Sequence, residues 1–467
     1  MAEQQSYDVT VIGSGPGGYV AAIRAAQLGL KTAIVEKWAA LGGTCLHIGC
    51  IPTKALLHSA DVLETAREAA KYGVTTGKVG LDLAGVHKFR VDVVRRQARG
   101  VEYLMKKNNI TVLSGHGRLK GAGRVEVTPG SGPAQSVATR NVILATGSTV
   151  KLLPGMKPDG HRVITSTEAL ALETLPKSML ILGAGAVGVE FASIYARFGT
   201  TVTIVEMLPR VLPIEDEEIS AEMLKALKKR GIEVKVATRF ESMKVGDKDV
   251  EIKVTSDKGA ETLKAEVLLV AVGRKPVTED LGLETTKVAV DRGFVKVDAM
   301  MRTAEPSIYA IGDIVPTPML AHLASHEGMV AAEAIAGKNP RPINYDHVPN
   351  ATYSDPEVAS VGLTEAAARA RGYKVKVGKF PFPPLGKGRI LNAQEGFVKL
   401  IGDERYDELL GVHAIGPRVT ELIAEGGLAL TLESTVEEIH HAIHAHPTLS
   451  EAMGEAALVL HGRGIHL

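Results

Sequence analysis

"YDVTVIGSGPGG" (residues 7–18) joins an apolar strand pattern directly to a glycine-rich turn, and "SMLILGAGAVG" (178–188) repeats the arrangement. Both turns have the spacing GxGxxG, which by itself says little because glycine-rich turns are common. The copies agree further: another glycine follows 11 residues after the last motif glycine, and an acid, Glu36 or Glu206, follows after 18. This repeated register predicts two Rossmann-type dinucleotide-binding units.

The glycines and the strand-end acids suit the parts of a dinucleotide. Glycine lets the backbone approach a pyrophosphate at a helix N-terminus, where free N–H groups favour anions. A carboxylate that ends the second strand accepts hydrogen bonds from ribose hydroxyls and repels a 2′-phosphate, so Glu206 favours NAD over NADP. The alternative for Glu36 and Glu206 is an ordinary solvated acid, which the repeated spacing disfavours.

Both cysteines of the 467-residue chain lie in "GGTCLHIGC" (42–50), as Cys45 and Cys50. In a regular helix, residues five apart have Cα atoms about 8–9 Å apart, and a disulfide tolerates about 7 Å. A bond would therefore need a bent segment, which the three glycines of this stretch permit. Spacing alone leaves open two unrelated buried thiols. Beside two dinucleotide sites, however, a thiol pair favours a redox enzyme with a flavin, which passes electrons between a hydride donor and a dithiol.

Composition excludes several classes of protein. Two cysteines in 467 residues do not make a disulfide-stapled secreted protein, and no second CxxC pair completes a zinc framework. Lys+Arg 54 against Asp+Glu 53 gives no electrostatic argument for nucleic acid or an anionic membrane. No apolar run reaches the roughly 18 residues that span a bilayer, and the strand pattern begins too early for a signal peptide. We expect a cytoplasmic protein that binds neither nucleic acid nor membrane.

"GGTCLHIGCIPTKALLHSA" (42–60) resembles the redox-active segment of the flavin disulfide reductases, and most closely that of the lipoamide branch. His47 and Thr53 stand where Asn and Ser are more common. The resemblance covers the whole chain. GSGPGGYVAAIRAAQLG resembles the FAD turn and helix of the family, and VILATGS (142–148) and VLLVAVGRKP (267–276) resemble the strands that close each nucleotide domain. SIYAIGDIVPTPMLAHLASHEG (307–328) resembles the second FAD segment and contains the run PMLAH, which is typical of the lipoamide branch.

The resemblance implies separate roles for the two thiols. Cys45 would exchange with the substrate, and Cys50 would face the flavin. Pro52 sets a helix start or kink near Cys50, and Lys54 lies one turn along, so both effects favour a thiolate. Lys54 is expected near the flavin and paired with Glu190, although a surface lysine and an ordinary helix acid are the local alternatives.

The segment "HHAIHAHPTLSEA" (440–452) supplies a candidate base. His446 precedes Pro447 and should lie in a loop, with Glu451 five residues on. A histidine held by a carboxylate suits the deprotonation of a dithiol near neutral pH, and the family uses such a pair. Thr448-x-x-Glu451 is also a helix capping box, which competes for the same side chain. His440 and His444 have a metal-ligand spacing, but no third ligand is identified, so we expect no metal.

The remaining site residues follow from the glycine turns and from the family resemblance. The resemblance implies that Asp313 holds the ribityl chain of FAD. The residues expected to bind the two dinucleotides are Gly13, Gly15, Gly18, Glu36, Gly43, Thr44, Lys54, Gly117, Thr146, Gly147, Gly183, Gly185, Gly188, Glu206, Gly273, Asp313, Met319, Leu320, Ala321 and His322.

The predicted fold is α/β, with two Rossmann-like dinucleotide-binding domains, for FAD and NAD, and a C-terminal α+β dimerisation domain. The sequence order suggests a first FAD part at 1–148, an NAD domain at 149–272, a central domain returning to FAD at 273–346, and an interface domain at 347–467. The resemblance implies a homodimer in which His446 of one subunit completes the site of the other.

The implied activity is oxidation of a protein-bound dihydrolipoyl group by NAD⁺ through a Cys45–Cys50 disulfide and FAD. The implied partners are lipoyl domains and the core subunit of a 2-oxoacid dehydrogenase complex or a glycine cleavage system. A glutathione reductase would need basic residues for the 2′-phosphate of NADP around 206–212, where Arg210 is the only base. A mercuric reductase would carry a C-terminal cysteine pair, whereas this sequence ends in HGRGIHL. A non-catalytic flavoprotein subunit or NADH sensor is the alternative from another class, which the complete set of site residues disfavours.

Overall fold

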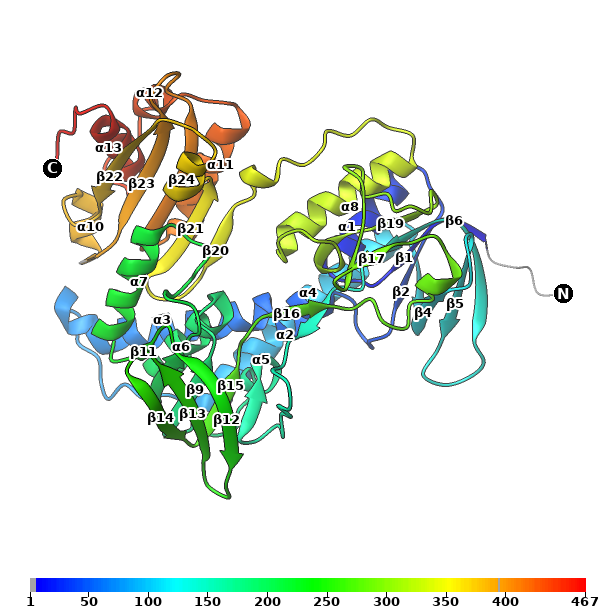
Figure 1. The fold of residues 1–467 in the computed structure, drawn as a ribbon, viewed down its shortest axis with the longest axis horizontal. Coiled ribbons are helices and arrows are strands. Elements are labelled where there is room, and N and C mark those ends of the chain that lie inside the picture. Colours follow the sequence, from blue (N-terminus) through cyan, green and yellow to red (C-terminus); the bar gives the residue numbers. More distant parts are fainter. Residues whose placement is uncertain (1–5, 394) are drawn as a thin grey trace. The chain divides into compact units, whose positions relative to one another are not determined.

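A computed structural model describes residues 6–393 and 395–467. The chain forms two compact units, each built from three segments (Figure 1). The first unit holds the chain up to Leu56, Ala84–Lys151 and Arg274–Ile343; the second holds Leu57–Leu83, Leu152–Gly273 and Asn344–Leu467. The finer division into four domains stays a prediction.

The sheet of the first unit contains the first nucleotide-binding repeat. Its parallel part has the order β3-β2-β1-β6, and β19 pairs with β6 in parallel. Strands β5 and β4 continue the sheet in antiparallel fashion. The bounds are β1 Ser6–Ile12, β2 Thr32–Glu36, β3 Thr111–Ser114, β4 His116–Leu119, β5 Arg124–Thr128, β6 Gln135–Leu144 and β19 Ile308–Ala310.

Helices α1 (Pro16–Gln27), α4 (Leu83–Lys107) and α8 (Ala321–Ile335) contribute to one core of this unit, together with residues of the central strands. Helices α1 and α8 approach closely because both present glycine at the contact. A Cβ on Gly17 would lie 2.9 Å from the carbonyl oxygen of Ala324, and one on Gly328 would lie 2.6 Å from that of Gly17. The strand β2 is buried along its whole length, as expected for a covered parallel sheet.

The second unit contains the second repeat, in a parallel sheet with the order β11-β10-β9-β15-β8. Its first four strands have the same order along the chain and across the sheet as β3-β2-β1-β6. The duplication expected from the sequence is therefore present in the topology. The bounds are β8 Val163–Thr165, β9 Ser178–Leu182, α6 Ala186–Phe198, β10 Thr201–Val205, α7 Glu217–Lys229, β11 Glu233–Lys235 and β15 Val267–Val270, with an antiparallel sheet of β12 Arg239–Val245, β13 Val250–Ser256 and β14 Gly259–Ala265.

The C-terminal part of the second unit is an antiparallel sheet with the order β20-β21-β24-β23-β22 and helices, as expected for an α+β domain. Phe380 and Phe382 are fully buried in its core. The bounds are β20 Asn350–Thr352, β21 Glu357–Gly362, α9 Glu365–Ala370, β22 Val375–Pro381, α10 Gly386–Ile390, β23 Phe397–Asp403, β24 Leu409–Gly416, α11 Val419–Thr431, α12 Val436–His441 and α13 Glu451–Leu460.

The remaining helices and strands are the long helix α3 Cys50–Glu68, the short helices α2 Gly43–Ile48 and α5 Ser166–Ala169, and the strand pairs β7 Ser148–Val150 with β16 Arg274–Pro276 and β17 Val290–Asp291 with β18 Phe294–Val295. Among the helices described, none is long and apolar enough to cross a membrane.

Candidate active site

The first glycine of each nucleotide turn is required by packing. Gly13 and Gly183 have φ of 102° and 105°, in the region that favours glycine. A Cβ there would lie 2.3 Å from the carbonyl oxygen of Ala145 and 2.4 Å from that of Ala271, at the ends of β6 and β15. A Cβ on the third glycine would lie 1.9 Å from the first glycine's carbonyl oxygen in one turn and 2.0 Å in the other. These glycines let strand, turn and helix close on one another.

The middle glycine of each turn has a different explanation. Gly15 and Gly185 are the N-caps of α1 and α6, and a Cβ on either would meet no atom within 4 Å. The chain's own packing therefore does not demand glycine there. The space lies at a helix N-terminus with free N–H groups, where a pyrophosphate needs close approach to the backbone. Both turns thus fit a dinucleotide.

The strand-end acids are fixed rather than solvated. Glu36 accepts the backbone N–H of Ser14 at 3.0 Å on one carboxylate oxygen and that of Trp38 at 2.8 Å on the other. Glu206 makes the corresponding bonds, at the same offsets along the chain, at 2.7 and 2.8 Å. The two residues are only 7% and 9% exposed. Each carboxylate keeps acceptor capacity for a ribose hydroxyl at the mouth of its turn, in Glu36 on the oxygen that accepts from Trp38.

The first turn also anchors the cysteine segment. The Ser14 hydroxyl donates to Glu36 at 2.6 Å and accepts the backbone N–H of Gly42 at 3.1 Å. A Cβ on Gly43 would lie 2.7 Å from the Cα of Gly15, so the segment rests directly on the turn. The second repeat has Ala184 at the position of Ser14 and lacks this hydroxyl.

The cysteines lie on two helices that break at Gly49. Cys45 belongs to α2, and Cys50 is the first residue of α3. A Cβ on Gly49 would lie 2.9 Å from the carbonyl oxygen of Thr44 and 3.1 Å from the Cα of Cys45. Glycine thus allows the start of α3 to approach Cys45, and the bent segment that a bond would need is present. At a helix N-terminus the dipole favours a thiolate on Cys50.

The structure holds the two cysteines as thiols that interact with each other. The hydrogen bond to Cys50, followed by burial, raises the pKa of the Cys45 thiol well above its usual range, and Lys54 only partly opposes this. Cys45 therefore holds its proton more firmly than a free thiol does. Tyr19 on α1 is a neighbour that the sequence analysis missed: burial, and then the electrostatic interaction with Cys45, raises the Tyr19 pKa.

A second missed feature lies beside Cys50. The guanidinium of Arg274 donates to the Ser148 hydroxyl at 2.6 Å and to its carbonyl oxygen at 2.8 Å, and the hydroxyl donates to Asp313. Burial lowers the pKa of Arg274, and negative charge on Asp313 and Cys50 opposes that shift. Arg274 and Ser148 lie inside the two closing-strand segments quoted above, yet nothing in those segments indicated that they meet.

The other predicted cofactor residues lie in the first unit, except Gly273, which follows β15 in the second. Gly147 and Gly273 follow the closing strands with φ of 72° and 109°. Thr146 donates its hydroxyl to the Val277 carbonyl at 2.6 Å, and Gly117 lies in β4. The residues 319–322 lie at the N-terminus of α8. Their cofactor contacts stay predictions.

In the second unit, His446 and Glu451 meet in the loop between α12 and α13. Nδ1 of His446 lies 2.8 Å from one oxygen of Glu451, whose other oxygen accepts the N–H of Thr448 at 2.8 Å. One carboxylate therefore orients the histidine and also makes half of the capping box. The other half is missing: α13 begins at Glu451 with Ser450 as its N-cap, and the Thr448 hydroxyl donates to the Ala445 carbonyl at 2.6 Å. Burial acts to raise the pKa of Glu451, but the hydrogen bonds with Thr448 and His446 lower it overall.

A neighbouring pair escaped the sequence analysis. His444 Nε2 lies 2.7 Å from Glu425 on α11, and this hydrogen bond raises the pKa of His444. The ring rests against α13, where a Cβ on Gly454 would lie 3.2 Å from Nδ1. Within residues 6–393 and 395–467, no group of three or more His, Cys, Asp or Glu side chains is placed to hold a metal ion.

Glu190 lies in α6, is buried, and accepts the backbone N–H of Tyr353 at 3.0 Å. Lys54 lies in the first turns of α3. The pairing of Lys54 with Glu190 stays a prediction.

Comparisons with known proteins agree with this class of site. Residues 7–328 match the family "Pyridine nucleotide-disulphide oxidoreductase", and residues 348–457 match its dimerisation domain. The fold and the site thus define a disulfide oxidoreductase that uses a pyridine nucleotide, and the chain belongs to the pyridine nucleotide-disulphide oxidoreductase family.

Similar full-length relatives are dihydrolipoyl dehydrogenases. That of Bacillus subtilis is 48% identical over 98% of this chain and 99% of its own length. The mitochondrial dihydrolipoyl dehydrogenase of Pisum sativum is 41% identical over 98% of this chain and 92% of its own. Among solved structures, LpdA from Mycobacterium tuberculosis superposes with a TM-score of 0.90 at 26% identity, covering 98% of this chain and 99% of that one.

Proposed function

We propose that the protein acts as a dihydrolipoyl dehydrogenase, which oxidises a protein-bound dihydrolipoyl group to the cyclic disulfide while NAD⁺ becomes NADH and a proton is released. The observation that carries the proposal is the thiol pair itself: Cys50 opens a helix, Cys45 shares a hydrogen bond with it, and the segment rests on the first nucleotide turn. The full-length relatives of that name support the choice of substrate.

His446 would start the reaction. Its Nδ1 is held by Glu451, which leaves Nε2 to accept a proton from a substrate thiol. The substrate thiolate would attack the sulfur of Cys45 in the Cys45–Cys50 disulfide. Cys50 would leave as a thiolate, which the N-terminus of α3 and the half-buried guanidinium of Arg274 would stabilise. The second substrate thiolate would displace Cys45 and close the lipoyl disulfide.

FAD, when bound, would take the electron pair from the reduced cysteines and pass it on to NAD⁺. We assign FAD to the first turn, because the cysteine segment rests on it, and NAD to the second. Glu206, fixed by two backbone N–H groups, would accept the ribose hydroxyls of NAD and repel a 2′-phosphate. As the family resemblance implies, Asp313 would hold the ribityl chain, and Lys54, paired with Glu190, would lie near the flavin.

The functional particle would be a homodimer, in keeping with the match to a dimerisation domain. His446, whose side chain is 75% exposed, would complete the site of the other subunit. The partners would be lipoyl domains and the core subunit of a 2-oxoacid dehydrogenase complex or a glycine cleavage system. A cytoplasmic location stays a prediction from cysteine usage.

A steady-state assay tests the proposal. We expect purified, FAD-loaded protein to reduce NAD⁺ with dihydrolipoamide and to oxidise NADH with lipoamide. Glutathione disulfide and mercuric ion, offered with NADH or NADPH, should give negligible turnover. Faster turnover with either of these, or no turnover with any substrate, would reject the assignment in favour of another reductase or a non-catalytic flavoprotein.

A further inference from the structure

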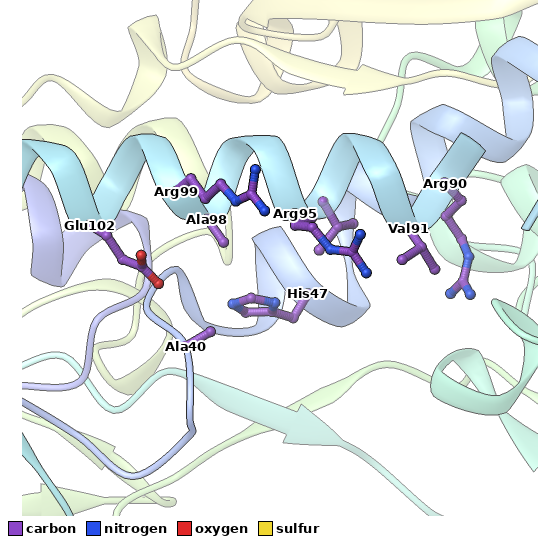
Figure 2. Close-up of a pocket in the computed structure, with 9 residues that line it drawn as sticks. Ala40, His47, Arg90, Val91, Arg95, Ala98, Arg99 and Glu102 are labelled. Carbon is purple, nitrogen blue, oxygen red and sulfur yellow. The ribbon is translucent and has the colours of Figure 1, made fainter. Parts of the chain in front are cut away.

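A basic groove separates α2 from α4 in the first unit. It encloses about 370 Å³ and is lined by Arg90, Arg95, Arg99 and Glu102 from α4 and by His47 from α2. Figure 2 shows His47 facing the stretch of α4 that carries these side chains. None of these residues takes part in the chemistry described above.

The fold balances the charges of Arg95 and Arg99 on this wall only weakly. Arg95 and Arg99 are one helical turn apart on the same face, so their like charges repel. Arg95 is 60% exposed and has a loose ion pair with Asp92 at 3.7 Å. Across the part of the chain that the structure describes, no carboxylate lies within ion-pair distance of Arg99. The guanidinium groups of Arg95 and Arg99 thus share a lining with one carboxylate, that of Glu102.

The spread of these cations identifies the kind of ligand. From Arg90 to Glu102 the wall extends about 18 Å along the helix, at 1.5 Å per residue. Apolar side chains, including Val94 and Ala98, lie between the charges. A single phosphate would need donors that converge on one point, whereas here they are strung out. An extended peptide with spaced carboxylates matches this pattern, because each guanidinium pairs with a carboxylate through two parallel hydrogen bonds.

The other wall of the groove belongs to the redox segment. His47 lies two residues from Cys45 on α2, and its Nε2 is 2.9 Å from the Leu41 carbonyl oxygen, which fixes the ring. We propose that this groove docks an acidic segment of the protein that carries the dihydrolipoyl group. The proposal rests on the proposed function and adds to it a site that recognises the carrier protein rather than the dithiol. His47 occupies a position where Asn is more common, and its ring forms part of the groove wall.

Docking of this kind predicts a division between two substrates. Free dihydrolipoamide has no acidic segment, so the groove should not affect it. A carrier-bound dithiol should bind more tightly because of the groove, and the gain should fall with ionic strength, since exposed charge pairs are screened.

The double variant Arg95→Gln/Arg99→Gln tests this, with Arg96→Gln/Lys106→Gln as the control that removes two charges from the same helix outside the groove. At low salt, we expect the groove variant to raise KM for a reduced, lipoylated lipoyl domain by roughly tenfold, as two exposed charge contacts would. Its kcat, and both constants for free dihydrolipoamide, should stay as in wild type. The control should match wild type with both substrates.

A binding measurement supplies a second arm. Trp38 is the only tryptophan of the chain, and its ring lies 6.1 Å from that of His47, so its fluorescence should report an occupied groove. Poly-L-glutamate should change this signal in wild type and in the control, and much less in the groove variant. Inorganic phosphate at equal ionic strength should not.

The outcomes separate the two proposals. If neither form of the dithiol is oxidised, the proposed function fails and the docking site fails with it. If both are oxidised but the groove variant behaves like the control, or raises KM equally for free and carried dithiol, the docking site alone is refuted. A phosphate response equal to that of poly-L-glutamate would likewise refute it in favour of a small-anion site.

Discussion

At the scale of single residues, the redox chemistry depends on an asymmetry between two thiols five positions apart. Cys50 opens α3, and the half-buried guanidinium of Arg274 lies near it, whereas Cys45 donates to Cys50 and has its pKa raised. The two sulfurs are therefore not interchangeable.

Replacing each cysteine separately should reveal that asymmetry. In FAD-loaded protein, we expect Cys45→Ser to show a long-wavelength absorption band from the Cys50 thiolate without any added reductant. Cys50→Ser should show no such band, even after addition of two electrons, because the serine hydroxyl does not ionise near neutral pH. Absorption spectra of the two variants check this, and identical spectra would contradict the assigned roles.

Glu206 should set the choice of coenzyme. We expect Glu206→Ala to lower the ratio of kcat/KM for NAD⁺ over NADP⁺ by roughly 10- to 100-fold, the size of about 1.5–3 kcal/mol for hydrogen bonds to a charged group. Glu36→Ala, the matched change in the other repeat, should instead lower the FAD content and leave the ratio in the loaded fraction intact. An unchanged ratio in the Glu206 variant would refute our interpretation of the second turn.

His444 should give the second unit a pH-dependent share of its stability. Its bond to Glu425 raises its pKa above the unfolded value of about 6.5, so this share is complete below that value and is lost as pH rises through the folded pKa. We expect His444→Gln to lower the free energy of unfolding most between about pH 5 and 6.5. Urea unfolding at several pH values measures this loss of stability, and His440→Gln serves as the control. A loss of unfolding free energy that does not shrink at higher pH would contradict the prediction.

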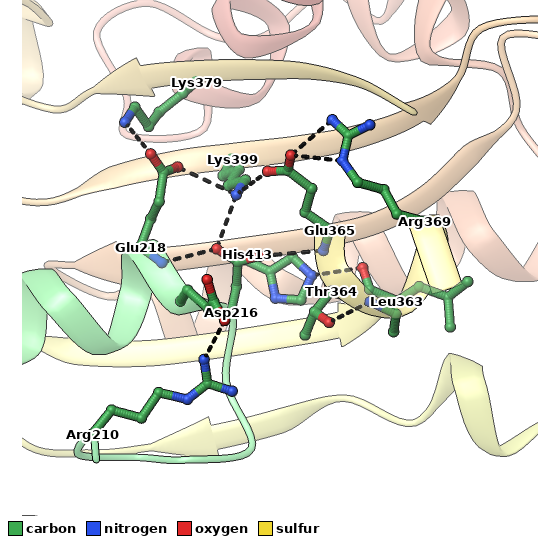
Figure 3. A network of polar contacts seen from close by, with 12 residues as sticks. Arg210, Asp216, Glu218, Leu363, Thr364, Glu365, Arg369, Lys379, Lys399 and His413 are labelled. Atoms are coloured by element: carbon green, nitrogen blue, oxygen red, sulfur yellow. Dashed lines mark hydrogen bonds and ion pairs between the residues drawn. The ribbon is translucent and has the colours of Figure 1, made fainter. Parts of the chain in front are cut away.

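At the scale of elements, a buried cation joins a strand to two helix N-termini (Figure 3). Lys399 on β23 is 2% exposed and lies 2.9 Å from Asp216, the N-cap of α7, and 2.8 Å from Glu365 at the start of α9. Although burial works against it, the bond to Lys399 lowers the pKa of Asp216. The cluster therefore stabilises the fold above the unfolded carboxyl pKa values and loses that effect as pH falls through the lowered folded values.

Removing this cation should be costly, because it leaves the buried carboxylate of Asp216 without a cation. We expect Lys399→Met to lower the stability of the second unit by about 3–5 kcal/mol near neutral pH, and the deficit to shrink in acid. Lys379→Met is the matched control: Lys379 pairs with Glu218 at 2.8 Å on the surface, and its loss should change stability by less than about 1 kcal/mol. Urea unfolding followed by circular dichroism compares them; equal effects would show that burial of the pair does not matter.

At the scale of the whole molecule, the proposed base and the thiols come from opposite ends of the chain, and the proposed function lets two subunits share each site. Neither Cys45→Ser nor His446→Gln should oxidise dihydrolipoamide appreciably as a homodimer. Co-refolded in equal amounts, about half of the dimers should be mixed, each with one intact site and one doubly damaged site.

Activity should then recover to about one quarter of the wild-type value, because half of the dimers contribute one of their two sites. Steady-state turnover after gel filtration measures the recovery, and FAD content shows that the mixed dimers are folded. If well-loaded mixed dimers stay inactive, the histidine does not act across subunits.

Much of this molecule was predictable from local spacing. Two glycine turns with an acid at the same offset determined both nucleotide-binding repeats, because strand, turn and helix geometry depends on neighbours within about thirty residues. The same holds for Cys50 at a helix start and for His446 in a loop before α13, which follow from Pro52, Gly49 and Pro447. The α/β class and the α+β C-terminal part followed from this and from the family resemblance.

Only the tertiary structure decided what surrounds those residues. Arg274 and Asp313 meet at Ser148 from 126 and 165 positions away, and Lys399 reaches Asp216 across 183. No periodicity encodes such contacts, because they arise when separate elements pack and bury charges that must then be paired. The basic groove between α2 and α4 arises in the same way: its cations are visible in the sequence, but the fold alone brings them opposite His47.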